Sequence, residues 1–150
     1  VYLHNLADSH STHVATAVAA IAALRQLPAA QQPKELYGVE IWRNLDWLPA
    51  KYRVELELDP LDPLQGELLR EFNSQLGGGK RYDLAASGRQ VANATFSSAH
   101  SVDRFKACIL AMDLMPLLHN PALLPGEFLR RVVEDFSTDV LGELARYEFQ

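Results

Sequence analysis

The sequence contains a single cysteine, Cys108, among its 150 residues. One cysteine cannot form a disulfide within the chain, so nothing indicates an oxidising compartment and we expect a cytoplasmic protein. Basic residues are also scarce: 14 lysines and arginines stand against 19 aspartates and glutamates, which gives a net charge of -5. A surface that binds nucleic acid needs clustered positive charge. Nucleic acid is therefore not an expected partner.

Long hydrophobic runs are missing as well. The longest mostly apolar segment, residues 14–24, is too short for a membrane span of about 20 residues and lacks the basic leader of a signal peptide. With 48% hydrophobic and 22% charged residues, the composition is that of a globular domain that can bury a core without disulfides. We expect one domain over residues 1–150 and no membrane span.

Hydrophobic periodicity predicts an α/β fold. Helices are expected over residues 12–26, 64–76, 82–96 and 127–147, and strands over residues 36–42 and 52–58. The apolar segment 105–118, interrupted by Pro116, is grouped with the mostly helical second half. Two strands cannot form a stable sheet alone. Either residues 1–6 form a third strand, or protein outside this chain completes the sheet.

Two histidines lie three residues apart at the start of the first expected helix, in Asp8-Ser9-His10-Ser11-Thr12-His13. This spacing places both imidazoles on one side of the helix, within reach of one metal ion or of a metal and its substrate. The positive end of the helix also favours the neutral, ligating imidazole. The alternative is a pair of surface or capping histidines, and spacing alone favours it.

Further motifs accompany the histidine pair. They are Leu36-Tyr37-Gly38-Val39-Glu40-Ile41-Trp42-Arg43, Ser74-Gln75, Tyr82-Asp83, Gly88-Arg89 and Asn93-Ala94-Thr95-Phe96. Together with residues 8–13 and the alanine-rich segment after them, these pieces resemble the PIG-L/LmbE family of zinc-dependent de-N-acetylases. The later pieces resemble the branch fused to glucosamine-6-phosphate deaminase-like proteins. The resemblance covers about two thirds of the chain and corresponds to the C-terminal part of the family's Rossmann-like fold.

The resemblance implies a zinc-dependent hydrolase that removes an N-acetyl group from an amino sugar such as N-acetylglucosamine. It assigns His13 as a Zn2+ ligand and His10 as the catalytic residue that stabilises the tetrahedral intermediate or donates a proton. Asn93 is a substrate-binding residue through the resemblance only. Glu40 and Arg43, at the end of an expected strand, could bind sugar hydroxyls or an acidic substituent, and the alternative is that they are rim residues beside Trp42.

Two departures from the family pattern change what we expect of this chain. The family commonly has Pro-Asp where Ser11 and Thr12 stand here, and its Ala-His-Pro-Asp-Asp motif, which carries the other zinc ligands and the general base, does not occur. A catalytic zinc site needs three protein ligands and an open position, and the recognisable ligands fall short of three. We therefore expect weak zinc binding and no activity from this chain by itself.

These departures and the small number of strands predict that the chain is the C-terminal portion of a larger domain. Its partner is then the missing N-terminal half or a second copy of itself, joined through an exposed sheet edge at residues 36–42 or 1–6. The alternative is a non-catalytic sugar-binding or interaction domain derived from the same fold.

Overall fold

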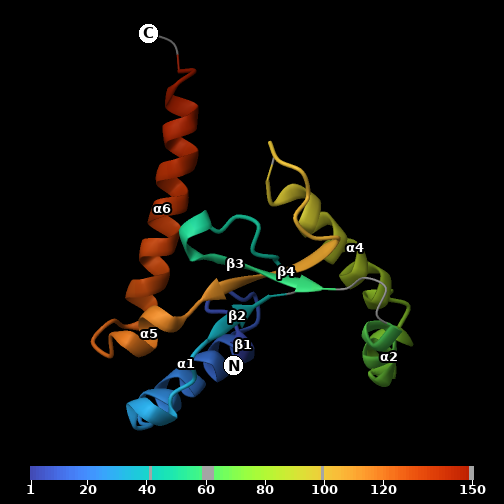
Figure 1. Cartoon of the computed structure of the whole chain (residues 1–150), viewed down its shortest axis with the longest axis horizontal. Coiled ribbons are helices and arrows are strands. Elements are labelled where there is room, and N and C mark those ends of the chain that lie inside the picture. The colour runs from blue at the N-terminus through green and yellow to red at the C-terminus, as the bar shows by residue number, and fades with distance from the viewer. Residues whose placement is uncertain (41, 59–62, 99, 149–150) are drawn as a thin grey trace. The chain divides into compact units, whose positions relative to one another are not determined.

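The computed structural model describes residues 1–40, 42–58, 63–98 and 100–148. It has the expected α/β character, with several helices and a mixed four-stranded sheet whose strand order is β1-β2-β4-β3 (Figure 1). The chain forms two compact units: unit 1 comprises Val1–Val54 and Ala111–Gln150, and unit 2 comprises Glu55–Leu110. None of the described helices is long and apolar enough to cross a membrane.

Unit 1 is built around two short parallel strands. Strand β1 (Tyr2–His4) pairs with β2 (Tyr37–Val39), placing Leu3 opposite Gly38. The end of β4 (Ala107–Asp113) pairs with the other side of β2 in the antiparallel sense. The unit also contains helices α1 (Ser11–Arg25), α5 (Met115–His119) and α6 (Pro125–Ala145), and single 3-10 turns at Ala29–Gln31 and Ala50–Tyr52.

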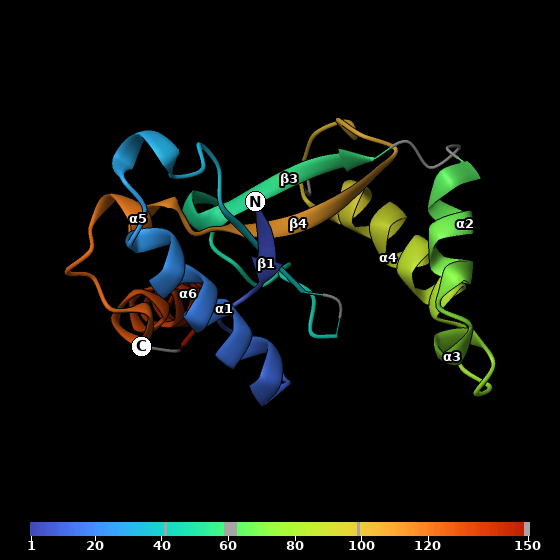
Figure 2. The same cartoon turned by 90° about the horizontal axis from the view of Figure 1, so that it is seen from below.

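Helix α1 follows β1 after a short loop and packs against β1 and α5 (Figure 2). Its many alanines favour the helix and allow close packing at Ala17 and Ile21, both fully buried. At its last turn, the Arg25 guanidinium donates to the carbonyl oxygens of Leu117 and Leu123, at 2.8 and 2.7 Å. These bonds satisfy buried carbonyls and fix α1, and therefore its first turn, against the rest of unit 1.

Gly38 allows β1 and β2 to approach closely. A Cβ atom at this position would lie 2.9 Å from the Cβ of Asn5, closer than real side-chain atoms come. Asn5 follows directly after β1 and its backbone N–H donates to the Val39 carbonyl at 3.1 Å. The glycine therefore lets the carboxyl ends of both strands lie side by side.

Helix α6 packs on unit 1 through the first half of its length. Phe128 and Val132 are buried, and the Tyr52 ring meets Phe128 edge-on at 5.9 Å. The Tyr52 hydroxyl donates to Asp135 at 2.6 Å, and Trp47 lies against Phe136 at 5.7 Å. The 3-10 turn and its neighbours thus form the surface on which α6 rests.

Unit 2 contains most of β3 (Arg53–Leu58), the start of β4, and helices α2 (Pro63–Glu71), α3 (Asn73–Leu76) and α4 (Tyr82–Phe96). Helix α4 begins beside an Arg81–Asp83 ion pair of 2.8 Å. Its buried face consists of Ala86, Asn93 and Ala94.

Most expected elements are confirmed. The helices near residues 12–26, 82–96 and 127–147 and the strand near 52–58 are present, and residues 1–6 do contribute a third strand, β1. The helix expected over 64–76 is divided into α2 and α3. The strand expected over 36–42 is shorter, and Ile41 lies outside the described residues.

Two expectations are wrong. Segment 105–118 contains strand β4 before the short helix α5, because a buried strand and a buried helix both appear as continuous apolar runs. Strand β2 is not an exposed edge, since it lies between β1 and β4, whereas β1, within the other expected segment 1–6, is an end strand of the sheet. The missed strand β4 is what covers that side of β2.

Candidate metal centre

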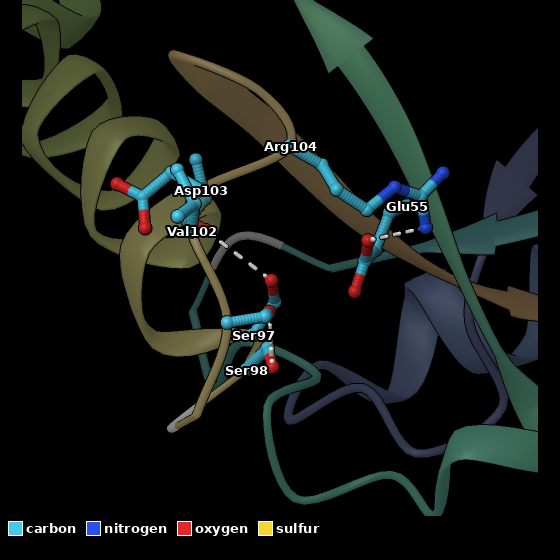
Figure 3. Close-up of a pocket in the computed structure, with 8 residues that line it drawn as sticks. Glu55, Ser97, Ser98, Val102, Asp103 and Arg104 are labelled. Carbon is cyan, nitrogen blue, oxygen red and sulfur yellow. Dashed lines mark hydrogen bonds and ion pairs between the residues drawn. The ribbon is translucent and has the colours of Figure 1, made fainter.

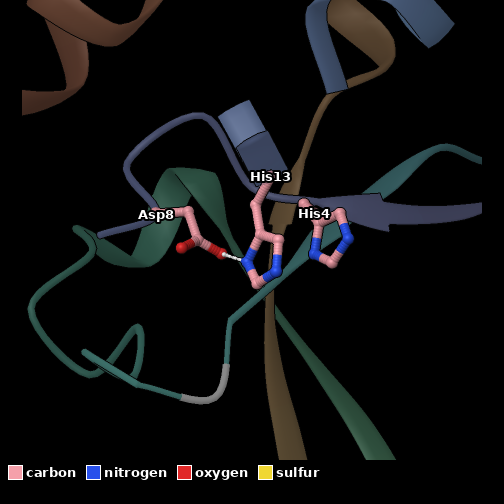
Figure 4. Close-up of side chains that lie close together, drawn as sticks. All are labelled: His4, Asp8 and His13. Carbon is pink, nitrogen blue, oxygen red and sulfur yellow. Dashed lines mark hydrogen bonds and ion pairs between the residues drawn. The ribbon is translucent and has the colours of Figure 1, made fainter. Parts of the chain in front are cut away.

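Three potential metal ligands converge where β1 passes into α1. His4 ends β1, Asp8 lies in the following loop, and His13 lies in the first turn of α1. One ligand atom from each side chain lies within 4.8 Å of the others, and all three residues are half-buried (Figure 4). A strand end, a tight loop and a helix start thus bring together residues from within one short stretch of sequence.

Asp8 orients His13. Nδ1 of His13 lies 2.9 Å from Oδ2 of Asp8, whose side chain is only 2% exposed. The other carboxylate oxygen accepts the backbone N–H of His10 at 2.8 Å. In the neutral tautomer in which Nδ1 donates to Asp8, the His13 ring has a lone pair on Nε2, the usual arrangement of a metal-ligating histidine.

The environment favours a charged Asp8. Its burial acts to raise the pKa, but hydrogen bonds from the His10 backbone and from His13 and Glu40 outweigh that effect and lower the pKa below its ordinary value. A charged carboxylate is the form that binds a metal or accepts the His13 proton.

Four aromatic rings make successive contacts, in the order His4, His13, His10 and Trp42. His4 and His13 are stacked, with centroids 3.9 Å apart and an interplanar angle of 3°. The exposed His10 ring lies 5.0 Å from His13, and Trp42 lies 5.6 Å from His10. The structure therefore brings both sequence-predicted histidines to one place and adds His4 on the far side of His13.

Glu40 directly follows β2, and its carboxyl accepts hydrogen bonds from neighbouring residues of the same chain. It is 8% exposed, and its Oε1 accepts the backbone N–H groups of Trp42 at 2.6 Å and Arg43 at 3.3 Å. Its Oε2 accepts Nδ2 of Asn5 at 3.4 Å. Burial and hydrogen bonding to Asp8 raise the pKa of Glu40 despite the two backbone donors. This carboxyl holds the turn after β2 in place.

The remaining predicted residues lie in different surroundings. The Arg43 side chain is exposed, next to Trp42. Asn93 belongs to unit 2, where it is buried on α4 and donates to the Cys108 carbonyl at 3.3 Å. Arg43 thus follows Trp42 in the turn after β2, whereas Asn93 packs in the interior of the other unit.

The three donors are of the chemical types that bind zinc in proteins. Zinc in proteins is bound by imidazole nitrogens and carboxylate oxygens at about 2.0–2.2 Å, which in a tetrahedral site separates neighbouring donors by about 3.3 Å. The cluster, with donors within 4.8 Å, has to contract slightly. Because the two imidazoles are almost parallel, one ring also has to turn before both can direct a nitrogen at the same ion.

Unit 2 has a separate polar pocket of about 220 Å³ at the end of α4 (Figure 3). Its charged residues are Asp103 and an ion pair between Glu55 and Arg104 of 3.6 Å. Hydroxyls of Ser98 and Ser101 bond to each other at 2.7 Å. The lining residues that the structure describes include no imidazole or thiol, so the pocket is a weaker candidate for metal chemistry than the cluster in unit 1.

His4 and Asn5 belong to this site but carry no helical spacing in the sequence, because they lie on and after a strand. The position of His4 within an apolar run, nine residues before His13, is the signal that points to it. Three side chains that could hold a metal ion thus lie together where the sequence offered fewer recognisable ligands.

No protein-family model, curated protein or solved structure matches this chain. The resemblance to the PIG-L/LmbE family therefore rests on the sequence motifs alone.

Proposed function

We propose that this chain carries the metal-binding part of a cytoplasmic, zinc-dependent hydrolase that removes the N-acetyl group from an amino sugar. Its sheet is then the C-terminal part of a Rossmann-like domain of the PIG-L/LmbE type. The observation that carries the proposal is the convergence of His4, Asp8 and His13 beside His10. The sequence resemblance supplies the reaction and the substrate class.

Three residues would hold the ion. His13 offers Nε2, because Asp8 takes the proton on Nδ1. His4 offers a second imidazole, and the carboxylate of Asp8 is close enough to serve as the third ligand or as the group that orients His13. When bound there, zinc supplies Lewis-acid polarisation of the amide carbonyl.

His10 is placed to act on the substrate. Its ring is exposed and lies beside His13 without belonging to the convergent donors. An imidazole one ring away from the ligands can donate a hydrogen bond to the carbonyl oxygen as negative charge develops, and a proton to the departing amine. This role agrees with the one that the resemblance implies for His10.

The general base is expected from outside these residues. Both carboxylates at the centre accept hydrogen bonds from this chain: Asp8 from His10 and His13, and Glu40 from Trp42 and Arg43. We propose that the missing N-terminal half, or a second copy of the chain, supplies the base. The same observation favours the second candidate function, a sugar-binding domain that binds without hydrolysing.

A zinc titration tests the metal part of the proposal. Calorimetry with the full chain is expected to give one zinc per chain and a large loss of affinity in His13→Ala. His119→Ala is the matched control, because His119 is an exposed histidine at the end of α5. Unchanged zinc binding in His13→Ala would refute the assignment.

Chemical rescue separates the enzyme from the binding domain. The zinc-loaded chain, incubated with N-acetylglucosamine, is expected to release acetate only when a small carboxylate such as formate is added at high concentration to replace the base. His10→Ala is expected to abolish that release. If the sugar binds and formate produces no acetate, the non-catalytic binding domain is the better description.

A further inference from the structure

We infer that Trp42 selects the substrate of this site by stacking against the apolar face of a sugar ring, an inference that rests on the proposed function. The observation is the position of Trp42 at the outer end of the line of rings that begins at the His4–His13 pair. A ligand whose ring lies on Trp42 has its substituents beside His10 and His13.

Trp42 is more exposed to solvent than a tryptophan usually is. Its side chain is 42% exposed, although tryptophan is usually largely buried. The other tryptophan, Trp47, is half-buried and lies edge-on against Phe136 at 5.7 Å and 71°. The two indoles of unit 1 thus differ: Trp47 packs against α6, whereas Trp42 is an exposed residue whose ring lies 5.6 Å from the His10 ring.

The backbone of Trp42 is fixed by the site itself. Glu40 accepts the Trp42 N–H at 2.6 Å, and Asn5, which follows β1 and is fully buried, donates to the same carboxyl. The strand end that carries His4 and the turn that carries Trp42 are therefore tied through one buried carboxyl. A recognition residue held in this way loses little entropy when ligand binds.

The geometry suits a pyranose. The His10 and Trp42 rings are tilted by 57° with centroids 5.6 Å apart, so they form two walls and not a closed stack. One face of a pyranose presents C–H groups, whose weakly positive hydrogens are attracted to the negative face of an indole. With the ring on Trp42, an N-acetyl substituent can extend past His10 toward His13. An acyclic amide has no ring face and gains nothing from Trp42.

Two-dimensional NMR of the full chain tests this inference directly. The indole N–H groups of Trp42 and Trp47 give two signals, which are assigned with Trp42→Phe and Trp47→Phe. N-acetylglucosamine is expected to shift the Trp42 signal saturably and to leave the Trp47 signal in place. N-acetylethanolamine, which has the same amide and no ring, is the control ligand and is expected to shift neither signal.

Variant affinities measure the contribution of the ring. By saturation-transfer NMR, Trp42→Ala is expected to bind N-acetylglucosamine about tenfold more weakly, whereas Trp42→Phe keeps most of the affinity and Trp47→Phe keeps all of it. Equal affinity in Trp42→Ala and wild type, or equal binding of both ligands, overturns the inference. Circular dichroism confirms that each variant is folded.

Running the titrations with zinc and with a chelator separates this inference from the proposed function. Zinc content is expected to stay at one per chain in Trp42→Ala. If the wild-type chain binds no zinc, the metal proposal fails while the sugar titration in chelator still reports on Trp42. If zinc binds and the sugar does not, in either condition, the selection by Trp42 is refuted and the metal centre stands.

Discussion

Asp8 and His13 are joined by a hydrogen bond of 2.9 Å between Oδ2 and Nδ1, made where the loop after β1 meets the first turn of α1. This contact fixes the orientation of the imidazole and decides which of its nitrogens faces away from the carboxylate. An imidazole oriented in this way is suited to bind a metal ion, whereas the spacing of His10 and His13 alone does not orient either ring.

Replacement of Asp8 by asparagine tests the contact. The side chain keeps its size, but an amide lacks the negative charge that stabilises the His13 proton and that attracts a cation. We expect zinc affinity to fall about 10- to 100-fold in Asp8→Asn, measured by calorimetry. Asp139→Asn, at an exposed carboxylate on α6, is the control and should bind zinc as the wild type does. Undiminished affinity in Asp8→Asn would show that Asp8 is only a structural neighbour.

The histidines are expected to separate into two classes. Zinc retention, measured by elemental analysis after dialysis, should be lost in His4→Ala and His13→Ala, because each removes one of three convergent donors. It should survive in His10→Ala, whose ring lies outside the donor set, although formate-dependent acetate release is expected to disappear. Equal zinc content in all three variants would contradict this division.

The three convergent donors raise the zinc affinity that we expect of the isolated chain. From His10 and His13 alone, zinc binding by the isolated chain should be weak, since two imidazoles leave most of the coordination to water. His4 and Asp8 bring the number of possible protein ligands to three. We now expect stoichiometric zinc binding without protein from elsewhere.

The helices could be predicted from the sequence because their patterns are local. The alanine-rich α1 and the periodic α4 and α6 lie within a few residues of their expected bounds. Strand β4 could not be identified, since its pairing with β2 joins segments more than seventy residues apart and an apolar run carries no sign of its partner.

The site was predictable only in part for a related reason. His10 and His13 lie on one helical turn, so their spacing shows that they are neighbours. The stacking of His4 on His13 depends on the path of the loop between β1 and α1, which Asn5 and Asp8 shape through hydrogen bonds to the Ala7 and His10 backbone N–H groups. Such loop geometry has no periodic signature in sequence.

Gly38 offers a test of the strand contact beneath the site. Gly38→Ala places a methyl group against Asn5, and β1 and β2 must separate to admit it. We expect a loss of about 1–3 kcal/mol in the free energy of unfolding, measured with urea, together with weaker zinc binding as His4 and Asn5 move. Gly88→Ala is the control, because Gly88 lies inside α4 with open space around it. That variant should instead be stabilised by about 0.5–1 kcal/mol. Destabilisation of both to the same extent would show that the close approach at Gly38 is not the cause.

Glu40 should make the stability of the chain depend on pH in a defined direction. Its pKa is raised above its ordinary value by burial and by hydrogen bonding to Asp8, so the folded state holds the proton more tightly than the unfolded state does. The stability that this carboxyl contributes is therefore complete below the unfolded pKa and is lost as the pH rises through the folded pKa. The lowered pKa of Asp8 acts in the opposite sense, because its contribution is lost as the pH falls.

Glu40→Gln isolates the first effect, since glutamine imitates the protonated side chain: its oxygen can accept the Trp42 and Arg43 N–H groups and its amide can donate to Asp8. In chelator, we expect the free energy of unfolding of Glu40→Gln to rise relative to wild type as the pH increases from 4 toward neutrality, with the Asp8 contribution common to both proteins. Glu134→Gln, at an exposed position on α6, should follow the wild-type curve. Urea unfolding at a series of pH values measures all three proteins. A constant difference between Glu40→Gln and wild type across this range would mean that folding does not raise the pKa of Glu40, and that the protonated carboxyl contributes nothing extra to the turn that carries Trp42.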